Sequence, residues 1–224
     1  MTRKHPCPYT PRILSALPGL LRARESHVHD PFAGEGSRLG AFCDEWGITF
    51  TGTEIEPSLI VDPRVAVGDA TVQFDYPLDA HTIVTSPVYP NGMADHFKAT
   101  DASDRNTYRQ VVASIEGGDR PLHTNNMGRW GYRGRGERSK ARKAYWKLAH
   151  DSVACWQVEH AIVNVKDFMV GDHVEPVVEQ WADTLRYHGF VIKREVVVPT
   201  PGQRRGANHR LRLDHEIILD AWAA

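Results

Sequence analysis

The chain has 224 residues, of which 41% are hydrophobic and 25% are charged, and its formal net charge at pH 7 is −1. This composition is typical of a globular protein and excludes a transmembrane one, because no apolar run approaches the roughly 20 residues of a membrane span. The first residues lack the apolar core of a signal peptide, so we expect a cytoplasmic protein folded as one domain over residues 1–224.

The first predicted element is a helix that follows a proline-stiffened lead over residues 5–10. Thr10 is a typical N-cap, and Pro11 suits the first helical position. Apolar residues at helical spacing, among them Ile13 and Leu17, predict that one face of this helix packs on the domain. We expect Pro18 to bend or shorten it.

Residues 28–39 have the order of a strand, a glycine loop and a helix. Gly34 and Gly36 allow the backbone to turn tightly and to approach a ligand closely. The helix is expected to begin at Ser37, with its positive dipole end directed at the loop, and to run towards Gly47. Its apolar face should carry Leu39, Phe42 and Trp46. A Gly-x-Gly of this kind is equally compatible with a tight turn that binds nothing.

Alternating apolar and threonine residues predict a second strand over residues 48–54 that ends at Glu54. Together with the preceding strand and helix it forms a right-handed βαβ unit. An acid at this strand end is placed to accept hydrogen bonds from the two hydroxyls of a ribose. Without a ligand, Glu54 would be a partly buried rim residue. A third short strand, from Val65, leads to Asp69.

The fourth predicted strand, residues 81–85, leads into Ser86-Pro-Val-Tyr-Pro-Asn-Gly. This proline-rich loop lies at the carboxyl edge of the sheet, where open α/β sheets bind ligands. On its own, such a loop could be only a structural turn.

The rest of the chain supplies further helices and strands and one long loop. Helices are predicted over residues 101–115, 139–156 and 174–188, and residues 116–136 are predicted to be a long mobile loop. Strands are predicted over residues 161–166, 190–199 and 209–220, the last two as an antiparallel hairpin. We therefore predict an α/β, Rossmann-like fold with a seven-stranded, mostly parallel sheet and a C-terminal antiparallel hairpin.

Basic residues are concentrated in two stretches despite the near-neutral total. The first contains Glu137 as its only acid and these cations: Arg129, Arg133, Arg135, Arg138, Lys140, Arg142 and Lys143. The second contains Arg204, Arg205, Arg210 and Arg212. Such local clusters can hold a polyanion on one face of a neutral protein, although a charged, solvated loop is the alternative.

Cysteine and histidine residues give no sign of a disulfide framework or a metal site. Cys7, Cys43 and Cys155 are far apart and odd in number, which indicates reduced thiols. None of the twelve histidines pairs with another histidine or a cysteine at the spacing of metal ligands on a convincing element. We therefore predict no metal.

Two motifs resemble those of the S-adenosylmethionine-dependent DNA amino-methyltransferases. Asp30-Pro-Phe-Ala-Gly-Glu-Gly-Ser is similar to the cofactor motif of that family, usually Asp-Pro-Phe-x-Gly-x-Gly-Thr. Thr85-Ser-Pro-Val-Tyr is similar to its catalytic motif, Ser-Pro-Pro-Tyr or Asp-Pro-Pro-Tyr. The lead around Tyr9 and Thr10 resembles the segment that closes over the cofactor. These signals occur in the family's order and cover most of the chain.

The resemblance implies S-adenosyl-L-methionine as the cofactor and a role for each matching residue. Glu54 would bind the ribose and Asp69 the adenine amine. Ser86 and the carbonyl of Pro87 would accept hydrogen bonds from the exocyclic amine of a target base, on which Tyr89 would stack. The implied cofactor-binding residues are Tyr9, Thr10, Asp30, Pro31, Phe32, Ala33, Gly34, Gly36, Ser37, Glu54, Ile55, Asp69 and Ala70.

The chain departs from the family pattern in two ways. Val88 replaces the second proline of the catalytic motif, which should alter the stiffness of the loop. No separate target-recognition domain is expected, so contacts with DNA would fall to residues 117–143 and to the link around Arg204; the residues implied are Arg129, Arg133, Arg135, Arg138, Lys140, Arg204 and Arg205. A serine at the head of the catalytic motif favours cytosine N4 over adenine N6 as the target.

Other functions remain compatible with the sequence. RNA base methyltransferases share similar glycine and catalytic loops, although they often carry an added RNA-binding domain. A nucleic-acid-binding protein could keep this fold without catalysis, which Val88 would permit. A methyltransferase of small molecules would not need the basic stretch.

Overall fold

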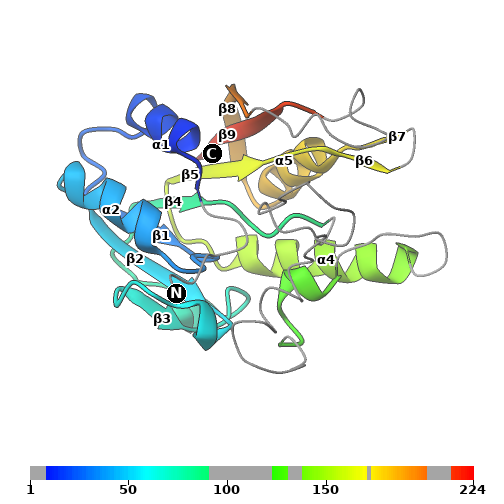
Figure 1. The fold of residues 1–224 in the computed structure, drawn as a ribbon, viewed down its shortest axis with the longest axis horizontal. Helices are drawn as coiled ribbons and strands as arrows, with labels where there is room; N and C mark the ends of the chain where they lie inside the picture. The colour runs from blue at the N-terminus through cyan, green and yellow to red at the C-terminus, as the bar shows by residue number, and fades with distance from the viewer. Residues whose placement is uncertain (1–8, 91–122, 131–137, 171–172, 201–212) are drawn as a thin grey trace, which may run out of the picture.

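The computed structural model describes residues 9–90, 123–130, 138–170, 173–200 and 213–224 (Figure 1). The predicted helix over residues 101–115, most of the predicted mobile loop, and Arg133, Arg135, Arg204 and Arg205 lie outside these ranges. Among the described residues, no helix is long and apolar enough to cross a membrane.

A seven-stranded sheet forms the centre of the molecule, in the order β3-β2-β1-β4-β5-β9-β8 (Figure 1). Its strands are β1 (His27–Asp30), β2 (Thr49–Glu54), β3 (Val65–Val67), β4 (Thr82–Thr85), β5 (His160–Val165), β8 (Phe190–Pro199) and β9 (His215–Ala223). The strands from β1 to β5 are parallel, and β9 runs antiparallel between β5 and β8. The predicted α/β fold with its C-terminal antiparallel hairpin is confirmed.

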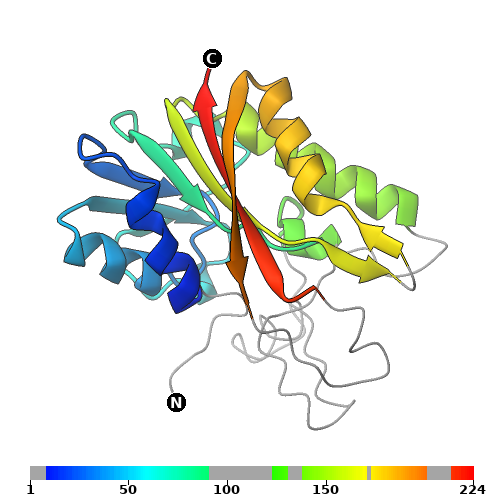
Figure 2. The ribbon, with the colours of Figure 1, turned by 90° about the horizontal axis from the view of Figure 1, so that it is seen from above.

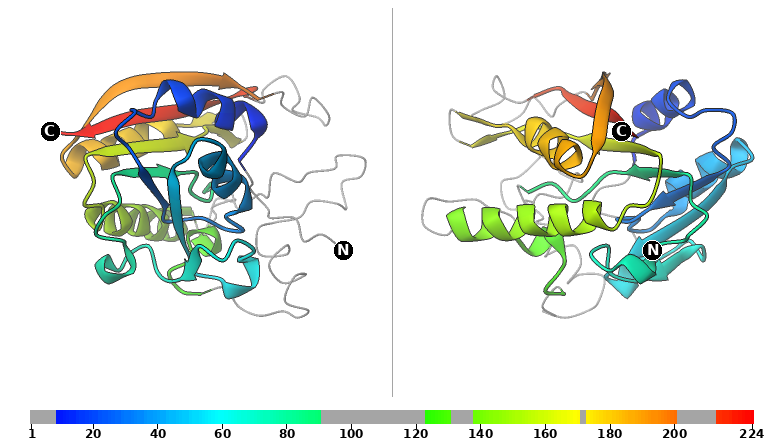
Figure 3. Two further views of the ribbon diagram at one scale, coloured as in Figure 1. Left: turned by 90° about the vertical axis from the view of Figure 1, so that its left-hand side faces the viewer. Right: turned by 180° about the vertical axis from the view of Figure 1, so that it is seen from behind.

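Helices cover both faces of this sheet (Figure 2 and Figure 3). The helices α1 (Pro11–Ala16) and α2 (Ser37–Glu45) pack on one face, and α4 (Arg138–Ala154) and α5 (Val177–Tyr187) pack on the other. Every residue of β1, β4 and β5 is therefore buried, as expected for parallel strands covered on two sides. Strand order reverses between β1 and β4. The carboxyl ends of the strands at such a point are where open α/β sheets bind ligands.

The first two helices begin as predicted, and both end early. The Thr10 hydroxyl caps α1 by accepting a hydrogen bond from the Ile13 amide at 3.3 Å. At Pro18 the chain continues as a 3-10 helix, η1 (Leu17–Gly19), so the predicted shortening is confirmed. The prediction that Trp46 belongs to the apolar face of α2 is wrong, because the helix ends at Glu45. The Trp46 side chain is 53% exposed and stacks on the Phe42 ring.

The helix predicted from Val174 begins three residues later. Residues 173–175 form strand β7 (His173–Glu175), which pairs with β6 (Phe168–Val170) in a small antiparallel hairpin. Pro176 explains the correction, because a proline disfavours the helical conformation of the residue before it. The helix α5 therefore starts at Val177, directly after Pro176 as its N-cap.

Part of the predicted mobile loop is packed. Residues 127–130 form a 3-10 helix, η5 (Met127–Trp130), in which Met127 is buried. Asn126, just before it, is also buried. This segment is therefore not an open loop: side-chain hydrogen bonds and an apolar contact pack it on the domain.

Candidate functional site

The glycine loop between β1 and α2 is closely packed on β3. Gly34 and Gly36 have φ angles of +56° and +70°, a region that side chains rarely adopt. A Cβ on Gly36 would lie 2.4 Å from Cγ2 of Val65. The turn and this close approach require glycine at position 36 whether or not the loop binds a ligand.

Asp30, at the end of β1, is a buried acid that joins three segments. Its carboxylate accepts hydrogen bonds from the Tyr9 hydroxyl at 2.9 Å, the Phe32 amide at 3.0 Å and the Thr85 hydroxyl at 2.7 Å. The Tyr9 hydroxyl also lies 3.2 Å from the carbonyl oxygen of Val84. Burial raises the pKa of Asp30 to about 6, although the three donors oppose this rise. Asp30 thus connects the lead, the glycine loop and the end of β4.

Glu54, at the end of β2, is the second buried acid of this edge. Its carboxylate accepts hydrogen bonds from the Gly34 amide at 3.0 Å and the Glu56 amide at 2.9 Å. Burial raises its pKa to about 7. Among the described residues, no lysine, arginine or histidine forms an ion pair with Asp30 or Glu54. Within the described part of the chain, hydrogen bonds therefore compensate the buried charge of both acids.

A pocket opens at the carboxyl ends of these strands, with an empty volume of about 420 Å³ that includes open solvent. The predicted cofactor residues that line it are Pro31, Phe32, Glu54, Ile55, Asp69 and Ala70. The other predicted cofactor residues do not line it: Tyr9, Thr10, Asp30, Ala33, Gly34, Gly36 and Ser37.

The segment before η5 closes one side of the pocket, which sequence reasoning missed. Asn125 Nδ2 donates to Asp69 Oδ2 at 2.7 Å, and Asn126 Nδ2 donates to Glu56 Oε1 at 2.8 Å. Asn125, Asn126 and Met127 line the pocket. One local signal was available: Asn126 Oδ1 accepts from the Gly128 amide at 2.8 Å, the turn that asparagine favours two residues before a glycine.

Asp69 is held by its own turn as well as by Asn125. Its Oδ1 accepts hydrogen bonds from the Thr71 amide at 2.9 Å and the Thr71 hydroxyl at 2.7 Å. Thr71 also lines the pocket, together with Val88 and Leu148. The lining thus combines two strand-end acids with asparagine amides and apolar walls.

The loop after β4 lies beside this pocket. Val88 lines the pocket, and its carbonyl accepts a hydrogen bond from the Tyr145 hydroxyl at 2.8 Å. Ser86 is half-buried, and its hydroxyl accepts from Asn164 Nδ2 at 3.2 Å. Tyr89 is 6% exposed, and its hydroxyl donates to Glu216 Oε2 at 2.9 Å. A base could stack on Tyr89 only after the ring leaves this position.

The described part of the first basic stretch is exposed at the start of α4 and on η5. Lys140, Arg142 and Lys143 are exposed, and Arg142 forms an ion pair with Glu175 at 3.1 Å. The Arg129 guanidinium lies 5.7 Å from the centre of the Trp130 ring. Because α4 leads into β5, its first turn lies at the carboxyl edge of the sheet, the edge that holds the pocket.

Comparisons with known proteins identify the fold. No protein-family model and no curated protein matches the sequence. The methyltransferase domain of bacterial CtHen1 is similar in structure, with a TM-score of 0.50 and 10% identity over 95% of this chain and 98% of that chain. A second similar structure has a TM-score of 0.50 and 11% identity, over 99% of this chain and 84% of that chain. It was reported for the conversion of a disulfide bond into a thioacetal group during echinomycin biosynthesis.

A third similar structure comes from Thermus thermophilus and is provisionally described as a DNA modification methylase complexed with S-adenosyl-L-methionine. Its TM-score is 0.41 and its identity 16%, over 70% of this chain and 51% of that chain. The two structures with a TM-score of 0.50 show that the chain has a Rossmann-like methyltransferase fold.

Proposed function

We propose that this chain is an S-adenosylmethionine-dependent methyltransferase that methylates an exocyclic base amine in DNA, with cytosine N4 favoured over adenine N6. One observation carries the proposal: a pocket at the point where strand order reverses is lined by the strand-end acids Glu54 and Asp69. Neither acid has a cationic partner among the described ion pairs. This arrangement suits a cationic ligand with several hydrogen-bond donors.

S-adenosylmethionine fits the chemistry of the lining. Glu54 would accept hydrogen bonds from the ribose hydroxyls, which the buried carboxylate favours when ionised. Asp69 would accept from the adenine amine. Phe32, Ile55 and Met127 supply the apolar walls that a flat base requires. When bound, the cofactor supplies an electrophilic methyl group on a positively charged sulfonium.

The loop after β4 would hold the methyl acceptor. In the proposed reaction, the Ser86 hydroxyl and the Pro87 carbonyl accept hydrogen bonds from the target amine and direct its nitrogen lone pair towards the methyl group. Transfer to such an amine depends on alignment and exclusion of water more than on a strong base. Ser86 is too weak a base to remove the amine proton first, so the proton leaves during or after transfer.

A base inside a duplex must leave the stack to reach Ser86, and an aromatic platform compensates part of the lost stacking. In the proposal Tyr89 provides that platform after its ring moves out of its buried position. The exposed cations at the start of α4 support DNA as the substrate, because Lys140 and Lys143 lie at the pocket's edge of the sheet.

The test uses the full chain, S-adenosylmethionine labelled in its methyl group, duplex DNA and transfer RNA. We expect calorimetric binding of the cofactor, and label in DNA that nucleoside digestion and mass spectrometry identify as N4-methylcytosine. Methyladenine would contradict only the base preference. If only transfer RNA is labelled, the substrate is RNA and the DNA assignment is wrong. If the chain does not bind the cofactor, the proposal that it is a methyltransferase is refuted.

Two variants test the roles in the catalytic loop. Tyr89→Ala should keep its affinity for the cofactor and lose roughly 1–3 kcal/mol of base stacking, by analogy with single-stranded nucleic acids. Ser86→Ala should lower turnover in a folded protein. Full activity in Tyr89→Ala would refute the assignment of this loop.

A further inference from the structure

A buried polar pair lies directly behind the loop that contains Ser86 and Tyr89. Asn164, near the end of β5, is 2% exposed, and Glu216, near the start of β9, is 5% exposed. Asn164 Nδ2 donates to Glu216 Oε2 at 2.7 Å. Burial of an amide and a carboxyl group is costly unless both are hydrogen-bonded. The hydrogen-bond partners of the pair therefore indicate which groups it holds in place.

The pair holds both hydroxyl groups of the loop. The Tyr89 hydroxyl donates to Glu216 Oε2 at 2.9 Å, and the Ser86 hydroxyl accepts from Asn164 Nδ2 at 3.2 Å. Asn164 Nδ2 also lies 3.4 Å from the Tyr89 hydroxyl. An amide nitrogen has two hydrogens, so the shorter bond to Glu216 uses one and the two hydroxyls share the other.

Glu216 determines which way the Asn164 amide faces. If the amide were reversed, its oxygen would meet the Glu216 carboxylate instead of donating to it. In the observed orientation, Ser86 accepts from Asn164 and keeps a second lone pair for another donor. Asn164 Oδ1 is buried and has no hydrogen-bond partner among the described residues. A buried polar atom left unpaired is unusual and calls for an explanation such as a functional role.

We propose that Asn164 and Glu216 are positioning residues of the catalytic loop, an inference that rests on the proposed methyltransferase function. They orient the Ser86 hydroxyl towards the target amine and hold Tyr89 until a base enters. Neither residue lines the pocket assigned to the cofactor. Their loss should therefore lower turnover and leave the affinity for the cofactor unchanged.

The test compares Glu216→Gln with Glu195→Gln, an exposed glutamate on the neighbouring strand β8. Glu216→Gln should lower kcat by about 10- to 100-fold, the effect of misplacing a reacting group, with cofactor Kd within about twofold of wild type. Glu195→Gln should match wild type in both. An unchanged kcat in a folded Glu216→Gln protein would overturn the proposal.

A second variant keeps the test decisive if Glu216→Gln does not fold. Tyr89→Phe removes one hydroxyl and retains the ring, and it should lower kcat severalfold with the same cofactor Kd. An unchanged kcat in Tyr89→Phe would then overturn the proposal. If the wild type itself transfers no methyl group, the proposed function fails and the positioning role fails with it; an active wild type with unaffected variants refutes the positioning role alone.

A double-mutant cycle tests the cluster without any catalytic readout. Glu216→Gln and Tyr89→Phe should be non-additive in denaturant unfolding, with a coupling of at least about threefold in the unfolding equilibrium constant. Additive effects would show that Tyr89 and Glu216 do not contact each other and would overturn the proposal.

Discussion

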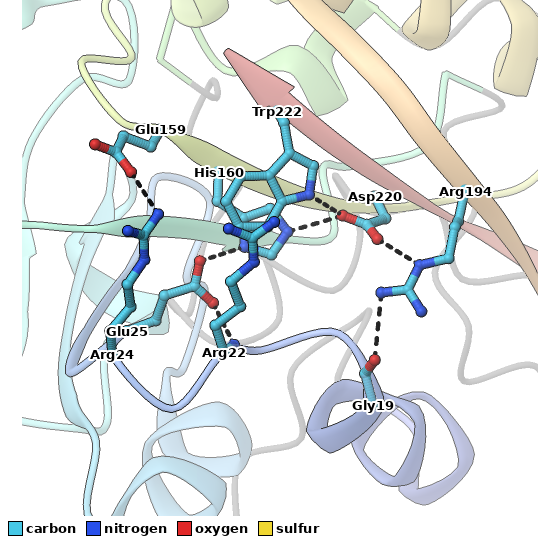
Figure 4. Close-up of polar contacts among 9 residues, drawn as sticks. All are labelled: Gly19, Arg22, Arg24, Glu25, Glu159, His160, Arg194, Asp220 and Trp222. Atoms are coloured by element: carbon cyan, nitrogen blue, oxygen red, sulfur yellow. Dashed lines mark hydrogen bonds and ion pairs between the residues drawn. The ribbon is translucent and has the colours of Figure 1, made fainter.

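Two clusters of buried polar residues lie at opposite edges of one sheet, and they differ in how their charges are compensated. At the amino edge, His160 lies between Glu25, with Nδ1 and Oε1 2.7 Å apart, and Asp220, with Nε2 and Oδ1 2.9 Å apart (Figure 4). At the carboxyl edge, Asp30 and Glu54 are buried with hydrogen bonds from backbone amides and hydroxyls.

The amino-edge cluster is closed by further contacts. Trp222 stacks on His160 with ring centres 3.8 Å apart, donates to Asp220 at 2.8 Å, and lies under the Arg22 guanidinium at 3.5 Å (Figure 4). Arg194 forms a second ion pair with Asp220 at 2.7 Å. Burial would raise the pKa of Glu25, but hydrogen bonds from His160 and the Arg22 amide lower it below its ordinary value.

This difference separates a stabilising cluster from the candidate binding site. At the amino edge the acids already have side-chain partners, His160 for Glu25 and both His160 and Arg194 for Asp220, so they have little to offer a ligand. At the carboxyl edge the pKa values of Asp30 and Glu54 are raised to about 6 and about 7, and Glu54 borders a pocket. Perturbed acids beside a pocket are typical of functional sites.

Breaking the closed cluster should have the largest effect on stability. Asp220→Ala removes one acceptor from each of His160, Arg194 and the Trp222 indole, and should lower the free energy of unfolding by about 3–5 kcal/mol. Denaturant unfolding measures this loss. Glu159→Ala, which breaks an exposed ion pair with Arg24, should cost no more than about 1 kcal/mol. Equal losses in the two variants would contradict the distinction.

Two glycines with similar backbone conformation test how tightly the carboxyl edge is packed. Gly36 has φ +70° and Gly47 has φ +66°, but a Cβ on Gly47 would meet nothing within 4 Å. Gly47→Ala should therefore show backbone strain alone, about 1–2 kcal/mol. Gly36→Ala adds the clash with Val65 and should cost about 1–3 kcal/mol more in thermal or denaturant unfolding. Equal costs would show that the loop can move away from β3.

Glu54 should make the stability of the ligand-free protein fall as pH rises. Its folded pKa, about 7, is above its ordinary value of 4.5, so between these values the folded state binds more protons than the unfolded state. The free energy of unfolding should decrease across this window by about 1–3 kcal/mol, with Asp30 contributing at its lower end.

Unfolding curves at several pH values measure this slope, and Glu54→Gln should remove the part that Glu54 contributes. The proposed cofactor should reverse the trend, since ribose hydroxyls donate to the ionised carboxylate: its affinity should rise as pH passes through about 7. A cofactor affinity independent of pH in the wild type would argue against a ribose at Glu54.

The smallest effect concerns the exposed cations. Lys140→Gln should weaken DNA binding and reduce the slope of log K against log salt by about 0.9 if it contacts one phosphate. Arg24→Gln, at the amino edge, should leave the slope unchanged because it lies away from the pocket. A fluorescence titration at several salt concentrations makes the comparison, and equal slopes for Lys140→Gln and the wild type would remove Lys140 from the interface.

Local patterns in the sequence were sufficient to predict the sheet and the edge at which its acids lie. Alternating residues before Glu54 and the glycines after Asp30 determine a strand, a tight turn and a helix through short-range sterics and hydrogen bonds. Parallel strands then bring their carboxyl ends to one edge, and the structure accordingly places Glu54 and Asp69 in one pocket. The start of α1 at Thr10 and Pro11 was predictable for the same reason.

Contacts between distant segments were decided only by the tertiary structure. Tyr89 and Glu216 are 127 residues apart, and His160 and Glu25 are 135 apart, so no local pattern links either pair. Asn125 and Asn126 belong to a glycine-rich stretch that looked mobile, yet they are held by acids at the exits of β2 and β3. Each pair meets because the strand order brings its segments together, and a buried polar side chain then bonds the nearest partner that its neighbours provide.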